Sequence, residues 1–141
     1  MPANNITTYL NFNGRCEEAL EFYKKTLGAR IEGLMRFKEA PQQGQECKPE
    51  NQNKVMHSAF WIGDTMLMAT DGMLNGEAVK FDGFTLTISA KDKAEVDRHL
   101  SALSEGGAIT MPASETFFAE RFGMAKDKFG VHWIALKQKP M

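Results

Sequence analysis

The two halves of the chain carry the same order of apolar patterns, and this repeat constrains the fold more than any other feature. In the first half, residues 7–13 alternate between apolar and polar side chains as a half-buried strand does. Residues 14–28 then place apolar side chains at the spacing of one helix face. Three strand-like apolar runs follow, at 30–38, 55–62 and 65–70. The first half therefore predicts a strand, a helix and three further strands.

The second half repeats this order. Residues 84–89 alternate as a strand does, and a second apolar helical stripe follows Asp92. Three further strand candidates complete the half, at 108–112, 117–125 and 131–137. The chain is thus predicted to be an α+β protein of two βαβββ modules, about 1–75 and about 80–138, in a single domain that spans 1–141.

Residues typical of element ends agree with these boundaries. Gly28 stands where the cap of a helix C-terminus is expected. The pair Asp92 and Glu95 has the spacing of a capping box, which begins a helix. Gly63-Asp64 separates two apolar runs and predicts a tight hairpin between them.

Two polar segments interrupt the apolar pattern of the first half. Residues 39–54 contain almost no large apolar side chain, so we expect a mobile loop there. Residues 71–81 are rich in glycine and asparagine and are expected to link the two modules.

Charge and apolar content exclude several classes of partner. The 17 basic residues are balanced by 18 acidic ones, so no basic excess exists to neutralise nucleic acid. No apolar run approaches the roughly 20 residues of a membrane span, and residues 1–8 lack the features of a signal peptide, so we expect no membrane partner and a cytoplasmic protein. Cys16 and Cys47 are too few and too far apart for a disulfide framework and are expected to be reduced thiols.

Several segments together resemble the vicinal-oxygen-chelate superfamily, which includes glyoxalases, bleomycin resistance proteins and dioxygenases, and most closely its PhnB-like branch. They span nearly the whole chain and are Tyr9–Gly14, Glu18–Tyr23, Leu27-Gly28, Val55–Ala59, Ile62–Asp64, Met66–Asp71, Phe122-Gly123 and Asp127–Trp133. The last segment is similar to a D-P-F-G-H-x-W motif of that branch, with Lys128 at the proline position and Val131 at the histidine position. The resemblance implies that the modules curl a mixed sheet around a cleft, and that the chain forms a homodimer.

The resemblance also implies where metal ligands would lie. In metal-dependent members, several strands each present one ligand to the cleft. The corresponding positions here lack imidazole and carboxylate groups, and they are Thr7 or Thr8, the run 65–69, Gly83 or Phe84, and Ile134. We therefore expect no family-type metal and no cofactor. A relocated site that uses His57 and His132, with Asp71 or Glu120, stays open as an alternative.

Six residues are candidates for contact with a small molecule in the expected cleft, and they are Tyr9, Asn11, His57, Trp61, Met68 and His132. His57 shares strand parity with Trp61, and a histidine there is able to orient a ligand or transfer a proton near neutral pH. A structural histidine is the competing interpretation. Met68, with Met66, Met56 and Met73, is suited to line an adaptable pocket, or simply to fill a core.

Trp133 is instead expected to pack in the core, and His99 is expected to lie on the second helix at the flank of its apolar stripe. The sequence contains no phosphate-binding glycine loop and no spacing typical of a catalytic triad. The functional hypothesis is therefore a small-molecule-binding protein. The alternatives are a metal-dependent lyase, isomerase or dioxygenase-like enzyme, and a structural or partner-binding protein.

Overall fold

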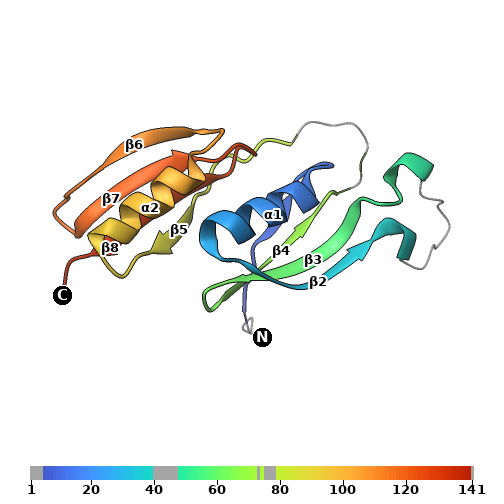
Figure 1. Cartoon of the computed structure of the whole chain (residues 1–141), viewed down its shortest axis with the longest axis horizontal. Coiled ribbons are helices and arrows are strands. Elements are labelled where there is room, and N and C mark those ends of the chain that lie inside the picture. The colour runs from blue at the N-terminus through green and yellow to red at the C-terminus, as the bar shows by residue number, and fades with distance from the viewer. Residues whose placement is uncertain (1–4, 40–47, 73, 75–78, 141) are drawn as a thin grey trace. The chain divides into compact units, whose positions relative to one another are not determined.

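The computed structural model describes residues 5–39, 48–72, 74 and 79–140. The chain divides into two compact units, Met1–Val79 and Lys80–Met141 (Figure 1). In the first unit the elements are β1 (Tyr9–Asn11), α1 (Cys16–Leu27), β2 (Arg30–Arg36), the short 3-10 helices η1 (Phe37–Glu39) and η2 (Pro49–Asn51), β3 (Val55–Ile62) and β4 (Thr65–Thr70).

The strands of the first unit form one mixed sheet in the order β1-β4-β3-β2. The first strand, β1, runs parallel to β4, while β4 with β3 and β3 with β2 are antiparallel pairs. The hairpin between β3 and β4 turns through Gly63 and Asp64, and Gly63 has a φ of 57°, so the tight hairpin predicted there is confirmed.

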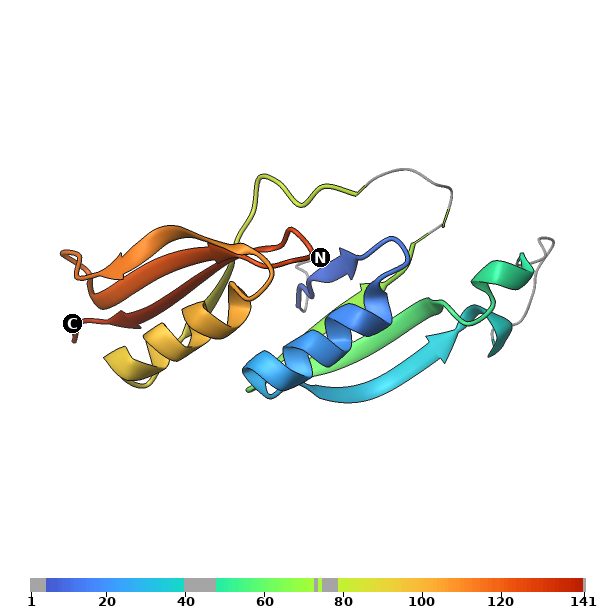
Figure 2. The same cartoon turned by 45° about the horizontal axis from the view of Figure 1, so that its top comes forward.

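One face of this sheet is covered by α1, which runs alongside β3 in Figures 1 and 2. The Tyr23 ring stacks on Phe60 of β3, with ring centroids 6.2 Å apart and planes 12° apart, and both side chains are fully buried. The helix ends at Gly28, which adopts the left-handed conformation with a φ of 69°, so the predicted cap is confirmed.

The second unit repeats the topology of the first. Its elements are β5 (Leu86–Ser89), α2 (Lys93–Leu103), β6 (Ala108–Ser114), β7 (Ala119–Lys126) and β8 (His132–Gln138). The strand order is β5-β8-β7-β6, with β5 parallel to β8 and the other pairs antiparallel. The α+β fold of two βαβββ modules is therefore confirmed.

The second helix also packs on one face of its own sheet, beside β7 and β8 (Figure 2). Leu100 of α2 lies so close to Gly123 of β7 that a side chain at Gly123 would collide with it. Trp133 is 3% exposed, which confirms the prediction that it belongs to the core. At the helix start, the Glu95 backbone N–H donates to the Asp92 carboxylate over 2.7 Å, as the predicted capping box requires.

Six of the eight described strands begin or end one or two residues away from the predicted position. The strand expected at 7–13 is only three residues long, because Asn13 turns the chain with a φ of 49°. The strand expected at 84–89 begins at Leu86. The predicted mobile loop has ordered flanks, because the backbone N–H of Phe37 bonds to Lys54 and that of Lys38 to Gln52.

Parts of two predicted segments, namely 40–47, 73 and 75–78, lie outside the described residues, and so do Cys47 and Met73. Among the described residues, no helix has the length and apolar character that a membrane span needs.

Candidate functional site

Five of the six predicted site residues lie on the face of the first sheet opposite α1. Leu10, Ser58 and Phe60 are buried on the α1 side, so their neighbours along each strand point the other way. We call this the helix-free face. Strand register assigns to it Tyr9 and Asn11 of β1, Met66, Met68 and Thr70 of β4, His57, Ala59 and Trp61 of β3, and Arg30, Gly33 and Met35 of β2.

Tyr9 and His57 form a hydrogen-bonded pair on the helix-free face. The Tyr9 hydroxyl oxygen lies 2.8 Å from His57 Nδ1, and the two rings meet edge to face with centroids 5.5 Å apart. Because β4 lies between β1 and β3, the tyrosine reaches across one strand to make this contact. The Tyr9 side chain is 48% exposed, so the pair is open to a ligand.

Aromatic and thioether side chains lie around this pair. Met68 stands between Tyr9 and Ala59 in register, and Trp61 is paired with Met66. Met35 is paired with His57 on the other side and is 40% exposed. This arrangement forms an adaptable apolar surface next to the Tyr9 hydroxyl group and the His57 imidazole.

Asn11 lies on the same face, but its side chain is used within the protein. The Asn11 side-chain oxygen accepts a hydrogen bond of 2.9 Å from the Asn13 backbone N–H. Its amide packs directly against Gly72, leaving no room for a side chain there. Asn11 therefore braces the turn from β1 into α1, which is an Asx-type turn.

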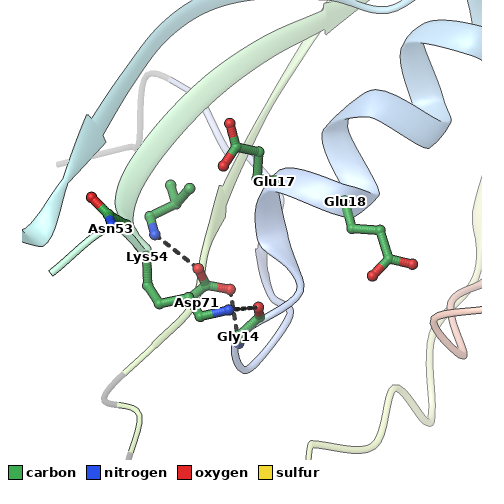
Figure 3. Close-up of a pocket in the computed structure, with 7 residues that line it drawn as sticks. Gly14, Glu17, Glu18, Asn53, Lys54 and Asp71 are labelled. Carbon is green, nitrogen blue, oxygen red and sulfur yellow. Dashed lines mark hydrogen bonds between the residues drawn. The ribbon is translucent and has the colours of Figure 1, made fainter. Parts of the chain in front are cut away.

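Asp71 has a structural role that the sequence did not reveal. It is 1% exposed, and its carboxylate accepts three backbone hydrogen bonds, from Gly14 (2.8 Å), Cys16 (2.7 Å) and Val55 (2.8 Å). Figure 3 draws Asp71 with Gly14 and Val55. Two of these donors belong to the start of α1, where Arg15 at the cap position makes no capping bond of its own. Asp71 thus caps the helix from the end of β4. The missing local cap is the signal that could have led to it.

A shallow hollow of about 270 Å³ adjoins this cap and is shown in Figure 3. Its lining residues are Gly14, Glu17, Glu18, Asn53, Lys54, Val55 and Asp71. The charged groups here bond to the protein itself: Glu17 binds Arg36 through two contacts of 2.9 and 2.8 Å, and the Lys54 ammonium donates to the Gly14 carbonyl over 2.8 Å. The Arg36 hydrogen bond lowers the pKa of Glu17. These contacts tie α1 to β2 and β3, and the hollow is structural.

Cys16 is buried behind this cap. Burial raises the pKa of its thiol to about 12, and Ser58 Oγ lies 3.8 Å from the sulfur. Because the thiolate is the nucleophilic form, Cys16 is unreactive at neutral pH.

His132, the sixth candidate, belongs to the second unit. It pairs with Lys126 and lies on the face opposite α2, because Trp133 and Ala135 are buried toward that helix. Nearby, Asp127 is 2% exposed and accepts hydrogen bonds from the backbone of Phe129 and Val131 and from the Trp133 indole. His99, excluded at the sequence level, lies 3.5 Å from Glu95 on α2.

Comparison with known proteins decides the family. Residues 4–135 match the model of the family described as 3-demethylubiquinone-9 3-methyltransferase. The chain belongs to this family. Protein YjdN of Escherichia coli (strain K12) is 34% identical over 144 residues, which cover 96% of this chain and 97% of YjdN.

Solved structures place the family within a larger fold group. Protein PA1353 from Pseudomonas aeruginosa has a TM-score of 0.84 at 33% identity, covering 98% of this chain and 100% of PA1353. A PhnB protein from Bacillus cereus has a TM-score of 0.77 at 27% identity, covering 95% and 99%. At the level of fold alone, a glyoxylase/bleomycin resistance protein/dioxygenase domain from Frankia sp. EAN1pec has a TM-score of 0.65 at 15% identity, covering 99% of this chain and 100% of that domain. The chain thus shares the fold of this domain, and it is similar in sequence and structure to a PhnB protein.

The metal that the vicinal-oxygen-chelate superfamily implies does not fit the side chains found here. Each expected ligand position carries a hydroxyl, thioether, alkyl or aromatic group, as at Thr8, Met66, Phe84 and Ile134. Asp71, considered for a relocated site, has its carboxylate engaged by three backbone donors. Within the part of the chain that the structure describes, no three His, Cys, Asp or Glu side chains converge on a common point.

Proposed function

We propose that this PhnB-like protein binds a small organic molecule on the helix-free face of its first unit, without a metal at the superfamily positions. The observation that carries the proposal is the Tyr9–His57 pair, in which an exposed tyrosine and a half-buried histidine are joined over 2.8 Å among apolar side chains. Ligand sites in proteins typically combine a largely apolar surface with a few polar groups that fix orientation. Trp61, Met66 and Met68 supply the apolar part.

A metal-dependent enzyme is the alternative that the superfamily suggests. It would need donors converging from several strands, and among the paired residues of the described strands His57 is the only imidazole or carboxylate on the helix-free face. Glu120, the remaining candidate, lies 3.7 Å from the Lys137 ammonium in the second unit. The donor set therefore favours binding over metal chemistry.

The name of the family refers to a methyltransferase, but a family name does not assign a reaction to this chain. Function is carried by a site and not by a family label or a fold. Each described sheet contains a single parallel strand pair, unlike the doubly wound parallel sheets whose strand-order switch point binds nucleotide cofactors.

We also infer that two copies of the chain associate. Tyr9 and Met35 leave apolar surface exposed on the helix-free face, and a second copy is the partner that the superfamily suggests. Calibrated light scattering should give the mass of a dimer, and a monomer at micromolar concentration would contradict this part of the proposal.

The binding proposal is tested with 2-naphthoate as a probe, followed by amide chemical shifts in ¹H–¹⁵N spectra. The probe should shift signals of β1, β3 and β4, and Met68→Glu should abolish these shifts because it places a carboxylate in the apolar surface. Met111→Glu is the matched control, since Met111 is an exposed methionine of β6 in the second unit. Shifts confined to other strands, or equal effects of both variants, would contradict the proposal.

Metal analysis addresses the alternative. Protein purified without an affinity tag should hold far less than one equivalent of any transition metal. Near-stoichiometric metal that is lost in the His57→Ala and His132→Ala double variant would instead establish a relocated metal site.

A further inference from the structure

We propose that Tyr9 holds His57 in the tautomer with its proton on Nε2, and that this Nε2–H binds a carboxylate oxygen of a flat aromatic ligand. The inference rests on the proposed function and names the ligand chemistry of the same face. In it Tyr9 is a positioning residue, while His57 contacts the ligand.

The direction of the Tyr9–His57 hydrogen bond follows from the chemistry of the two groups. A neutral imidazole has one N–H and one bare nitrogen, and the bare nitrogen is far more basic than a phenol oxygen. The Tyr9 hydroxyl has no other partner among the described residues, so its proton is free to turn toward His57 Nδ1. With Nδ1 accepting, the ring proton must reside on Nε2.

The Nε2–H of His57 is left as an available donor. Within the part of the chain that the structure describes, the His57 side chain makes no hydrogen bond other than the one with Tyr9. When the imidazole takes up a second proton, Nδ1–H donates to the Tyr9 oxygen and Nε2–H is still a donor. The pair therefore presents a hydrogen-bond donor in either charge state, which suits a ligand that carries an acceptor.

The surroundings of His57 favour a flat ring that bears a negative charge. Trp61, Met66 and Met68 offer an indole and two thioethers, which pack well against aromatic rings. Strand register places Arg30 on this face as well, while Glu32, the carboxylate of β2, stands unpaired at the bulge between Ile31 and Gly33. The ring of an aromatic carboxylate packs against the apolar surface, and its carboxylate accepts the His57 hydrogen bond. A cation would be repelled by Arg30 and cannot accept the N–H.

A purely structural pair is the competing explanation, in which Tyr9 and His57 only attach β1 to the sheet. That attachment already exists in the backbone, where Met68 N–H bonds to the Thr8 carbonyl over 2.9 Å and Phe12 N–H bonds to the Thr70 carbonyl over 2.8 Å. The half-exposed side-chain bond adds little to these. It does fix which nitrogen of His57 faces outward.

The tautomer is measured on protein whose histidine rings carry ¹⁵N, through long-range ¹H–¹⁵N correlation. The chain has three histidines, so His99 and His132 serve as internal controls. We expect His57 to carry its proton on Nε2, and Tyr9→Phe to shift only the Nδ1 resonance of His57. This variant keeps the ring contact and removes the hydroxyl. A proton on Nδ1, or an Nδ1 resonance that Tyr9→Phe leaves in place, overturns the inference.

Ligand chemistry is tested with two probes that share one ring system, 2-naphthoate and 2-naphthylmethylammonium. The first accepts hydrogen bonds, and the second has donors only. His57→Phe should lower the affinity for 2-naphthoate about tenfold, as expected for loss of a hydrogen bond to a charged group, and change the affinity for the ammonium probe less than about twofold. Tyr9→Phe should lower the affinity for 2-naphthoate about two- to threefold, because the Tyr9 hydroxyl no longer polarises the His57 ring. His132→Phe is the matched control and should change neither probe.

The outcomes separate this inference from the function on which it rests. If neither probe shifts signals of Trp61 or Met68 in the native protein, the proposed function fails. If 2-naphthoate binds the native protein and His57→Phe equally well, binding on this face stands and the inference fails. Equal loss of both probes in His57→Phe also overturns it, because that result indicates general damage to the surface.

Discussion

The two units share one topology but differ on the sheet face opposite their helices. Across β1, β4 and β3 the first unit places Tyr9, Met68 and Ala59 in one row, and the second unit places Thr87, Ile134 and Met124 at the matching positions of β5, β8 and β7. Two residues before Ala59 stands His57, whereas Phe122 stands two residues before Met124. The hydrogen-bonded pair thus exists in one module only. The two modules therefore share a backbone topology, while their chemistry differs through individual side chains on one sheet face.

The starts of the two helices differ in a second, instructive way. In α2 the cap is local, since Asp92 accepts the Glu95 N–H and Glu95 in turn accepts the Lys91 N–H over 3.1 Å. In α1 the capping carboxylate is that of Asp71, 55 residues after the Cys16 N–H it accepts. A local cap serves one helix end, but Asp71 also binds Val55 of β3 and so joins three segments. The first unit therefore depends more on a single carboxylate.

The largest expected effect follows from this dependence. Asp71→Ala leaves three backbone N–H groups, two of them fully buried, without an acceptor, so the free energy of unfolding of the first unit should fall by about 3 kcal/mol or more. Urea unfolding followed by tryptophan fluorescence measures this change. The chain has two tryptophans, Trp61 in the first unit and Trp133 in the second, so single Trp→Phe variants report each unit separately.

Asp127→Ala is the matched comparison for Asp71→Ala. Asp127 is equally buried and also accepts three hydrogen bonds, but it lies in the second unit. Each substitution should lower the stability of its own unit first. If Asp71→Ala lowers the free energy of unfolding measured from Trp61 by less than about 1 kcal/mol, the Asp71 cap does not stabilise the first unit as proposed.

A smaller effect is expected at the local cap of α2. Asp92→Ala removes one exposed capping bond, and such changes typically cost about 1 kcal/mol. The free energy of unfolding measured from Trp133 should therefore fall by roughly a third of the amount by which Asp71→Ala lowers the value measured from Trp61. Equal losses at the two caps would remove the contrast between a local and a long-range cap.

Local features of the sequence were sufficient to predict the order of elements. Helical spacing, the glycine at position 28 and the Asp92 capping box each act within a few residues, and all three are confirmed. Strand alternation likewise placed His57 and Trp61 on one face. The polar segment around residues 48–54 was misjudged because its order comes from backbone bonds to the 3-10 helix η1, which follows β2.

The partners within the site were beyond the same reasoning. Tyr9 meets His57 only because β4 inserts between β1 and β3, and strand order is a property of the whole unit. Asp71 looked like the first residue of a linker and a possible metal ligand, yet its role depends on the arrival of two distant backbone segments. Chemistry at a site requires both residue identity and tertiary proximity, and the sequence supplied the first.

The smallest expected effect concerns the Glu17–Arg36 pair, which joins α1 to β2 beside the Asp71 cap. Hydrogen bonding to Arg36 lowers the pKa of Glu17, and the Glu17 side chain is 54% exposed, so solvent screening limits the pair to about 0.5 kcal/mol. A carboxylate whose pKa is lower in the folded state stabilises the fold above its unfolded pKa, and this contribution disappears as the pH falls through the folded pKa. Glu17→Gln should therefore slightly lower the free energy of unfolding measured from Trp61 at pH 7, and it should have no effect once the pH is below the lowered pKa.

Glu21→Gln on the same helix, where the Glu21 carboxylate lies 3.8 Å from the Lys24 ammonium, is the control and should change the free energy of unfolding less. A Glu17→Gln effect of the same size at pH 7 and at pH 2 would show that packing, and not the charge pair, links α1 to β2.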